Sequence, residues 1–337
     1  MDNSMRVADW LDIWTEEFLC AVKPRTVQKY RSIIENHLKP GLGEYLLNEL
    51  DGLTIQRFYN DQVQGRNGWR AISPKTLKDL HGILHEALQQ AVDLGYIERN
   101  PTCACRIPRV EKPEISPLDS DQIAAFLGTI NGHRFEALYI VTLFTGMRRA
   151  EVCGLMWDCV DFEHGTICVK RQRQKNPDEA GTFVMSGTKN GRSRFIKPAA
   201  SVMELLRSVK AQQDQLRLCA GGKWRDTGFV FTNELGDPVS PNTVYNTYKK
   251  IVASIGLPNS RLHDLRHSFA VCSIMSGDDI KTVQENLGHS SASFTLDRYG
   301  HVTEQMRQAS SERMEKFFLE VSGKGSVMPS TLGSLTR

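Results

Sequence analysis

The sequence lacks the cysteine pattern of a disulfide-bonded secreted protein or of a zinc-binding protein. Its eight cysteines form no C-x-x-C pair and follow no apolar leader segment; they lie at positions 20, 103, 105, 153, 159, 168, 219 and 272. We therefore expect reduced thiols in a cytoplasmic protein. Cys103 and Cys105 are the one close pair, and without further Cys or His nearby they do not favour a zinc site, which needs four ligands.

Long hydrophobic runs and a strong net charge are also missing. No apolar stretch approaches the roughly 20 residues that cross a bilayer, so a membrane role is not expected. The formal net charge is only +3, which neither requires nor excludes nucleic acid, so the local clustering of charge must decide. At 337 residues the chain exceeds the usual span of one hydrophobic core, which indicates two domains.

The apolar periodicity predicts a mainly α-helical protein with a small β-sheet insert (α+β). We expect a helical domain at residues 1–105, a linker at 106–117, a second domain at 118–320 and a flexible tail at 321–337. The linker has no apolar period and contains three prolines, and the tail is rich in Ser, Gly and Thr.

Local signals place helices in the first domain. Apolar residues recur at helical spacing from Val7 to Phe18, and a second helix starts at Pro24. A third is expected from Thr76 to Val92, with Ser73 as its N-cap and Gly95 as the left-handed residue that ends it. The exposed face of the second helix would carry Arg25, Lys29 and Arg31.

The second domain is expected to combine helices with a short β insert. Asp119 or Ser120 caps a helix through Leu127, and a strongly apolar helix covers Arg134 to Phe144 and ends near Gly146. Thr166–Val169 and Arg194–Ile196 read as strands around the turn residues Asn190-Gly191. Helices then resume to about residue 320.

Arg148 follows a glycine turn in Thr145-Gly146-Met147-Arg148 and is expected to start a helix whose apolar side is Val152, Leu155 and Met156. An arginine at a helix N-terminus favours a phosphate. A surface ion pair between Arg148 and Glu151, three residues apart, is the competing interpretation.

Two histidine clusters precede a tyrosine near the end of the chain. His263 and Arg266 are three residues apart, with His267 beside them, so an imidazole and a guanidinium fork share one helix face and could bind two oxygens of a phosphate. Leu287-Gly288-His289-Ser290 adds a further imidazole, and Tyr299 follows ten residues later. Each piece alone is also compatible with a structural role.

The β insert is locally basic. Residues 165–197 contain eight Lys or Arg and two Asp or Glu, and Lys189 lies beside the Asn-Gly turn. A solvated hairpin with ordinary surface lysines is one interpretation. The other is an element whose cations neutralise DNA phosphates and whose Lys189 reaches a leaving oxygen.

The order of these motifs resembles the tyrosine recombinase, or phage integrase, family. The likeness rests on Thr-Gly-x-Arg-x-x-Glu, a Lys on a β turn, His-x-x-Arg-His, Leu-Gly-His-Ser and Tyr-Gly-His, over roughly residues 118–310. Residues from Val7 to Pro101 look like the family's helical core-DNA-binding domain, so the second domain would be the catalytic domain.

The resemblance implies a metal-free and cofactor-free attack of a tyrosine on DNA. Tyr299 would form a 3′-phosphotyrosyl link, Arg148 and Arg266 would clamp the non-bridging oxygens, and Lys189 would protonate the 5′-oxygen. His263 would move a proton or bind the phosphate, and His289 would donate a hydrogen bond to it. Glu151 and Asp264 are expected to be structural, and no carboxylate set typical of a two-metal nuclease accompanies the cations.

The implied activity is site-specific recombination that integrates or excises a mobile element. The partners would be double-stranded DNA, three further copies of the chain in a homotetramer, and an excision factor or DNA-bending protein; the protein would be nucleoid-associated when bound to DNA in a bacterium. The residues predicted to contact DNA, each with surface solvation as the competing interpretation, are Arg25, Lys29, Lys75, Lys170, Arg171, Arg173, Arg192 and Arg194.

Three other functions remain open at this stage. An armless recombinase that resolves chromosome or plasmid dimers shares every motif, although the long insert from Arg171 to Thr188 and the proline-rich linker look more like integrases of mobile elements. A type IB topoisomerase shares the phosphotyrosine step. A non-catalytic DNA-binding protein would use the same cations, with Tyr299 as a core residue. The core-binding pattern begins within ten residues of Met1, so an arm-binding domain is either absent or missing from this sequence.

Overall fold

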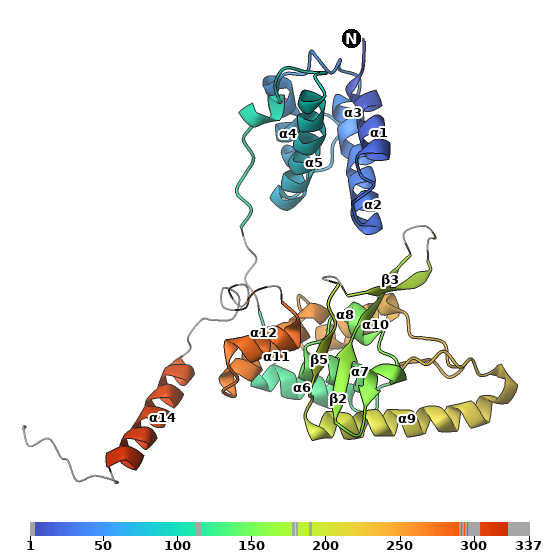
Figure 1. Cartoon of the computed structure of the whole chain (residues 1–337), viewed down its shortest axis with the longest axis vertical. Coiled ribbons are helices and arrows are strands. Elements are labelled where there is room, and N and C mark those ends of the chain that lie inside the picture. The colour runs from blue at the N-terminus through green and yellow to red at the C-terminus, as the bar shows by residue number, and fades with distance from the viewer. Residues whose placement is uncertain are drawn as a thin grey trace, which may run out of the picture. The chain divides into compact units, whose positions relative to one another are not determined.

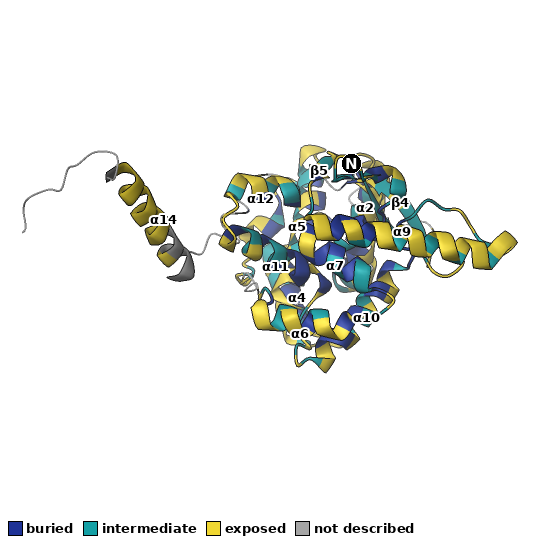
Figure 2. Cartoon of the chain, turned by 90° about the horizontal axis from the view of Figure 1, so that it is seen from below, coloured by how far each residue is buried: buried dark blue, intermediate teal, exposed yellow. Residues whose placement is uncertain are grey.

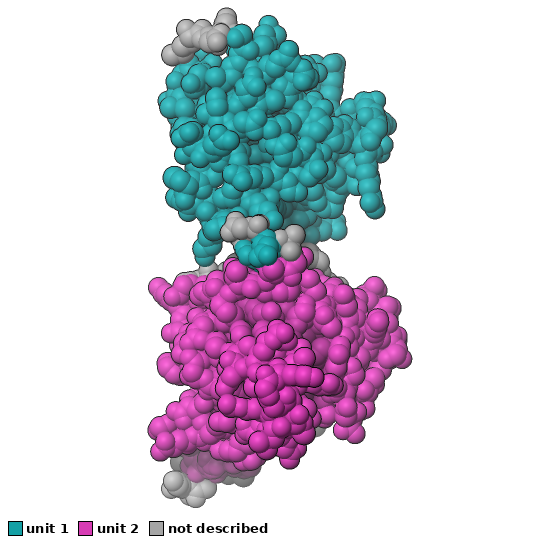
Figure 3. Space-filling model, turned by 90° about the vertical axis from the view of Figure 1, so that its right-hand side faces the viewer, with its two compact units in different colours: residues 1–114, 176–180 teal, residues 115–175, 181–337 magenta. Residues whose placement is uncertain are grey.

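Figure 1 shows a computed structural model of the chain, which describes residues 4–111, 116–176, 179, 181–188, 191–289, 291, 293, 295 and 304–322. The chain divides into two compact units (Figure 3). Unit 1 comprises Met1–Glu114 and Asn176–Ala180, and unit 2 comprises Ile115–Lys175 and Gly181–Arg337. The structure is mostly helical with small antiparallel sheets, which confirms the predicted fold class.

Unit 1 is a helical bundle around a core of aliphatic and aromatic side chains. Trp10 is buried, and its indole Nε1 donates a hydrogen bond to the carbonyl of Ala87 at 2.9 Å, which ties the first helix to the last long one. The helices are α1 (Val7–Glu17), α2 (Pro24–Ile33), the π-helix η1 (Ile34–Leu38), α3 (Lys39–Leu42), α4 (Gly52–Gln64), α5 (Pro74–Asp93) and the 3₁₀-helix η2 (Pro101–Ala104).

The predicted helix ends of unit 1 are confirmed where capping residues mark them. The Ser73 hydroxyl accepts from the backbone N–H of Thr76, and Gly95 follows α5 with φ of 77°. The helix predicted from Pro24 continues without a break through η1 and α3, an extension that the sequence pattern did not indicate. Arg25, Lys29 and Arg31 are exposed on α2, as predicted.

Unit 2 has a core that contains three aromatic rings. Phe126 of α6, Tyr139 of α7 and Tyr248 of α10 lie with ring centroids 5.7–5.9 Å apart, and the Tyr139 hydroxyl donates to the carbonyl of Val244 at 2.8 Å. The helices are α6 (Ser120–Ile130), α7 (Glu136–Thr145), α8 (Arg149–Val152), η3 (Trp157–Cys159), α9 (Ala200–Ala220), η4 (Gly221–Lys223), α10 (Pro241–Ser254), α11 (Leu262–Met275), α12 (Ile280–Leu287) and α14 (Glu304–Ser322).

Burial follows the expected apolar faces of these helices. Asp119 caps α6 through the backbone N–H of Gln122, and Gly146 ends α7 in the left-handed conformation, both as predicted. The buried residues of α9 lie in its first turns, and its later turns are exposed or half-buried (Figure 2). The flexible tail was predicted at 321–337, but residues 321 and 322 are the last of α14, and the rest of this stretch lies outside the described residues.

The β insert contains two small sheets. Both predicted strands are confirmed as β2 (Thr166–Val169) and β5 (Arg194–Ile196), which pair antiparallel in a sheet of order β1-β2-β5 with Ile167 opposite Ile196. The pattern missed β1 (Val160–Asp161) and a separate hairpin, β3 (Arg171–Lys175) with β4 (Phe183–Gly187). Gly191 has φ of 69°, whereas Asn190 lies outside the described residues.

The helix expected after Arg148 is shorter than predicted. It ends at Val152, so the buried Leu155 lies beyond it and Met156 precedes η3. Gly154 lets β3 pack closely against the end of α8, because a Cβ there would meet the backbone N of Arg173 at 2.7 Å and the carbonyl of Ala150 at 2.9 Å.

Candidate active site

Arg266 lies on α11 with only 1% of its surface exposed. Its Nη1 donates to the carbonyl of Gly146 at 2.6 Å and its Nη2 to the carbonyl of Leu287 at 2.5 Å. A buried charge needs such partners, because an unpaired guanidinium would lose its hydration without compensation. These bonds join α11 to the end of α7 and the end of α12.

Arg148 is the N-cap residue of α8 and reaches the same place. It follows Gly146, whose φ is 63° and where a Cβ would lie 2.5 Å from Phe269 Cδ1. The tight turn therefore requires glycine. Arg148 Nη2 donates to the carbonyl of Gly288 at 3.3 Å, and 23% of its side chain is exposed.

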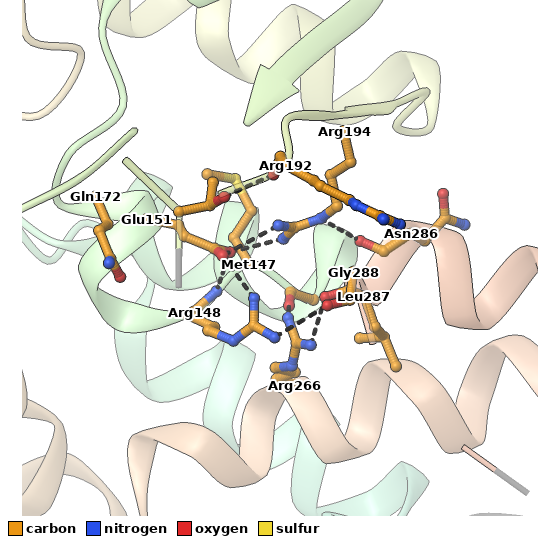
Figure 4. A network of polar contacts seen from close by, with 12 residues as sticks. Met147, Arg148, Glu151, Gln172, Arg192, Arg194, Arg266, Asn286, Leu287 and Gly288 are labelled. Atoms are coloured by element: carbon orange, nitrogen blue, oxygen red, sulfur yellow. Dashed lines mark hydrogen bonds and ion pairs between the residues drawn. The ribbon is translucent and has the colours of Figure 1, made fainter. Parts of the chain in front are cut away.

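Glu151 is buried between two arginines, with 1% of its surface exposed (Figure 4). It accepts from the backbone N and Nη1 of Arg148 at 2.9 and 2.7 Å, and from Nη1 and Nη2 of Arg194 at 3.0 and 2.6 Å. Burial acts to raise the pKa of Glu151, but the hydrogen bonds and charges of Arg194 and Arg148 outweigh it and lower the pKa to about 2. The surface-pair interpretation of Arg148 and Glu151 is therefore wrong, whereas the expected structural role of Glu151 fits this geometry.

His263 and His267 lie one helical turn apart on α11, with ring centroids 4.8 Å apart and nearly perpendicular planes. The His263 residue has an exposed edge, yet partial burial of its ring, followed by the charges of His267, Arg266 and Arg148, lowers its pKa to about 4. The ring is therefore neutral at pH 7. Asp264, between the two histidines in sequence, is buried and binds Arg261 at the start of α11, which fits its expected structural role.

His289 follows the glycine that ends α12. Its Nδ1 lies 2.8 Å from the hydroxyl of Thr295, a buried residue, and this contact orients the ring. Partial burial and the charges of Arg266, Arg148, His267 and His263 lower the pKa of His289 to about 3. Because the same arginines act on both histidines and bind the turn before His289, Arg148, His263, Arg266 and His289 converge from three distant segments of the chain.

Lys189, Ser290 and Tyr299 lie outside the described residues, so their predicted roles stay predictions. The chain on either side of Lys189 is described: the Thr188 hydroxyl donates to the carbonyl of Arg192 at 2.6 Å, and the N–H of Gly191 donates to the carbonyl of Thr188 at 2.9 Å.

The predicted DNA-contact residues of unit 1 differ in their surroundings. Arg25 is exposed. Lys29 and Lys75 both bind the carboxylate of Asp79, at 2.7 and 2.9 Å. Exposed ion pairs of this kind are weak, so DNA phosphates can compete for both lysines.

The predicted DNA-contact residues of unit 2 have more internal partners. Lys170 and Arg171 pair with Asp158 at 3.2 and 2.5 Å, and Arg192 is exposed. Arg173 donates to the carbonyl of Val239 at 2.6 Å and stacks over the Phe183 ring.

Arg194 does not fit its predicted DNA contact. Its guanidinium binds Glu151, its Nε donates to the carbonyl of Asn286 at 2.8 Å, and only 11% of the side chain is exposed. The fork is turned into the protein, and the geometry argues against a direct contact with a DNA backbone.

Two partners of the cluster were not found from the sequence. Thr295 touches His289, and the carbonyl of Asn286 touches Arg194, and neither carried a signal that would mark it.

Among the residues that the structure describes, no group of three or more His, Cys, Asp or Glu is arranged to hold a metal ion. No helix in the same part of the chain is long and apolar enough to cross a membrane.

Comparison with known proteins assigns the class of this two-unit chain. A family described as "Phage integrase family" matches residues 117–306, and one described as "Phage integrase, N-terminal SAM-like domain" matches residues 7–62. The chain therefore belongs to the phage integrase family, the tyrosine recombinases. This is an enzyme class that cleaves and rejoins DNA strands, so the resemblance drawn from the motifs is confirmed.

Curated relatives span most of the chain. A "Tyrosine recombinase XerC-like" protein of Caldanaerobacter subterraneus subsp. tengcongensis is 30% identical over 94% of this chain and 84% of its own length. An "Integrase" of Saccharopolyspora erythraea is 23% identical over 93% of this chain and 82% of its own.

Solved structures share the fold. The integrase of transposon Tn1549 in complex with transposon right end DNA aligns with a TM-score of 0.76 and 21% identity, over 92% of this chain and 100% of that one. A lambda integrase tetramer bound to a Holliday junction aligns with a TM-score of 0.64 and 21% identity, over 86% of this chain and 79% of that one.

Proposed function

We propose that the protein is an integrase that cuts and rejoins DNA at specific sites through a 3′-phosphotyrosyl intermediate, and so integrates or excises a mobile element. The observation that carries this proposal is the convergence of Arg148, His263, Arg266 and His289, which chain order separates widely, into one cationic cluster. Family membership supports the reaction class.

In this proposal the Tyr299 oxygen attacks the scissile phosphorus as the bond to the 5′-oxygen breaks. The phenol, with an ordinary pKa of about 10, must lose its proton to a neighbour. His263 is the candidate acceptor because its imidazole is neutral at pH 7, although its lowered pKa makes it a weak base in the free protein. Lys189 gives a proton to the departing 5′-oxygen, which leaves a free 5′-hydroxyl.

The clamp on the phosphate falls to the arginines and His289. Arg148 is partly exposed and presents its guanidinium to the non-bridging oxygens, whereas the buried Arg266 adds its positive charge to the site. His289, whose ring is oriented by the contact between its Nδ1 and the Thr295 hydroxyl, donates to a phosphate oxygen.

We further propose how the chain assembles. Residues 1–105 form the core-DNA-binding domain and residues 118–320 the catalytic domain, joined by the linker at 106–117. Four copies bring four active sites to two duplexes, in the manner of the lambda integrase tetramer on its Holliday junction. Arg25 and Arg192, exposed in the structure, contact backbone phosphates, and an excision factor or DNA-bending protein sets direction on the bacterial nucleoid.

The first test uses nicked duplexes that carry candidate attachment sites. The wild type should form a covalent adduct on a denaturing gel in the presence of EDTA, Tyr299→Phe should form none, and Lys189→Ala should form it slowly. Tight binding to validated sites without an adduct would contradict the proposal and favour a non-catalytic DNA-binding protein. Formation of Holliday junctions from two duplexes would separate a recombinase from a topoisomerase.

A dimer-resolving recombinase is the second candidate, favoured by the XerC-like relative at 30% identity. The two functions differ in their substrates, because integration joins unlike sites and dimer resolution joins identical ones. Recombination of paired plasmids that carry unlike sites from an element end and its target would support the integrase. Recombination restricted to identical sites would support the resolvase.

A further inference from the structure

Three arginines bind three successive backbone carbonyls where α12 ends. Arg194 Nε donates to Asn286 at 2.8 Å, Arg266 Nη2 to Leu287 at 2.5 Å and Arg148 Nη2 to Gly288 at 3.3 Å (Figure 4). The last carbonyls of a helix have no N–H partner within it and carry partial negative charge. The guanidinium groups therefore cap α12 and fix the turn that leads to His289.

Arg194 approaches this turn closely. Gly288 has φ of 63°, and a Cβ at this position would lie 3.0 Å from Arg194 Cδ and 3.2 Å from its Nη1. Arg194 belongs to β5, where it pairs with Val169, so the sheet holds the arginine from the other side. The Arg194 side chain therefore connects β5, to which it belongs, with Glu151 of α8 and with the end of α12.

Around Glu151 the positive charges of the arginines outnumber the single negative charge of the carboxylate. Glu151 is shared, with two hydrogen bonds from Arg148 and two from Arg194. If Arg148 were its only partner, the carboxylate would offset most of the charge that Arg148 offers to a phosphate. With Arg194 in place the group keeps a surplus of positive charge beside the exposed part of Arg148.

We propose that Arg194 is a positioning residue of the recombination reaction. It neutralises Glu151, which leaves the charge of Arg148 available to the scissile phosphate, and it holds the end of α12 so that His289 is in place. This inference rests on the proposed function. It assigns to Arg194 a part in the cleavage step and none in the affinity for DNA.

The test compares Arg194→Gln, Arg194→Lys and the double variant Arg194→Gln/Glu151→Gln. The rate of adduct formation on saturating nicked DNA should fall about 10- to 100-fold in Arg194→Gln, as expected for a partner that orients a reacting group, with affinity for the core site within about twofold of wild type. Arg194→Lys, which keeps the charge but loses the fork, should react at an intermediate rate. The double variant should be about tenfold faster than Arg194→Gln, because Arg148 is no longer offset by an unmatched carboxylate.

A contact with DNA predicts the opposite pattern. Affinity and its salt dependence would then fall with each variant, and the rate at saturating DNA would be unchanged. Arg192→Gln, on the exposed arginine two residues earlier, serves as the comparison for that behaviour. Arg207→Gln, which removes an exposed arginine paired with Glu204 on α9, controls for loss of charge and should react as the wild type.

Two results would overturn the inference: a wild-type rate in Arg194→Gln, or a double variant no faster than Arg194→Gln. Melting temperatures identify variants that do not fold. If Arg194→Gln alone is the variant that does not fold, the other two variants decide. A wild-type rate in Arg194→Lys would refute the inference. So would a folded double variant that reacts over a hundredfold more slowly than Arg194→Lys. Failure of the wild type to form an adduct would instead refute the proposed function, because the wild type and Tyr299→Phe are run in the same assay.

Discussion

Replacement of Glu151 by glutamine should destabilise unit 2 in a pH-dependent way. The pKa of Glu151 is lowered from 4.5 to about 2, so its ionised form favours the folded state. Because the side chain is buried, the shift can be converted with little discount for solvent, at about 1.4 kcal/mol per pKa unit. The loss at pH 7 should be about 3 kcal/mol, in the range for breaking a buried ion pair.

The pH dependence has a definite sign. A lowered folded-state pKa gives stability that is present in full above the unfolded value of 4.5 and is lost as the pH falls toward 2. Glutamine resembles the protonated acid, so the difference between wild type and variant should shrink to about 1 kcal/mol at pH 3.

Urea unfolding followed by tryptophan fluorescence measures this difference. Trp157 reports on unit 2, and a Trp157→Phe variant identifies the transition that belongs to it. A Glu151→Gln variant as stable as wild type at pH 7 would refute the reasoning. So would a loss of equal size at pH 7 and pH 3, because the ion pair would then not be its cause.

Three further outcomes are expected. Gly288→Ala should cost about 1–2 kcal/mol in unfolding free energy because φ is positive there, and should slow adduct formation; an unchanged rate would show that the turn need not be held. Thr295→Val should slow adduct formation by roughly five- to tenfold, the equivalent of one hydrogen bond, and leave DNA affinity unchanged in a binding titration. Because the pKa values of His263 and His289 in the free protein are lowered to about 4 and about 3, the rate at DNA concentrations far below saturation, which reports groups of the free protein, should not drop between pH 8 and pH 6 as it would for a histidine that titrates near 6.5; a drop with a midpoint near 6.5 under these conditions would contradict the shifts. The same lowered values mean that the histidines reduce stability as the pH falls below 6.5, because the unfolded chain then takes up the protons.

The sequence predicted those features that neighbouring residues determine. The caps at Ser73 and Asp119, the glycine after α7 and the two strands β2 and β5 each depend on a few consecutive side chains. The spacing within each motif fixes only its own helix or turn, and it was the resemblance to the tyrosine recombinase family that placed Arg148, His263, Arg266 and His289 in one site.

The sequence did not predict what depends on contacts between distant segments. Arg194 looks like any other cation of a basic insert, and its inward direction is set by Glu151, 43 residues earlier, and by Asn286, 92 residues later. The need for glycine at position 154 likewise depends on the close approach of β3. Spacing along the chain carries no signal for either contact.

Positive charge contributes to all three lowered pKa values at this site. The guanidinium groups of Arg194 and Arg148 keep Glu151 ionised, whereas partial burial together with the charges of Arg266 and Arg148 keeps His263 and His289 neutral. A phosphate bound among the arginines would cancel part of that positive charge and so raise the pKa of His263. A proton acceptor that is weak in the free protein would then become a stronger base once DNA is in place. If this holds, the imidazole resonance of His263 should titrate at a higher pH in the DNA complex of Tyr299→Phe than in the free variant. An unchanged titration would mean that the cluster does not couple phosphate binding to proton transfer.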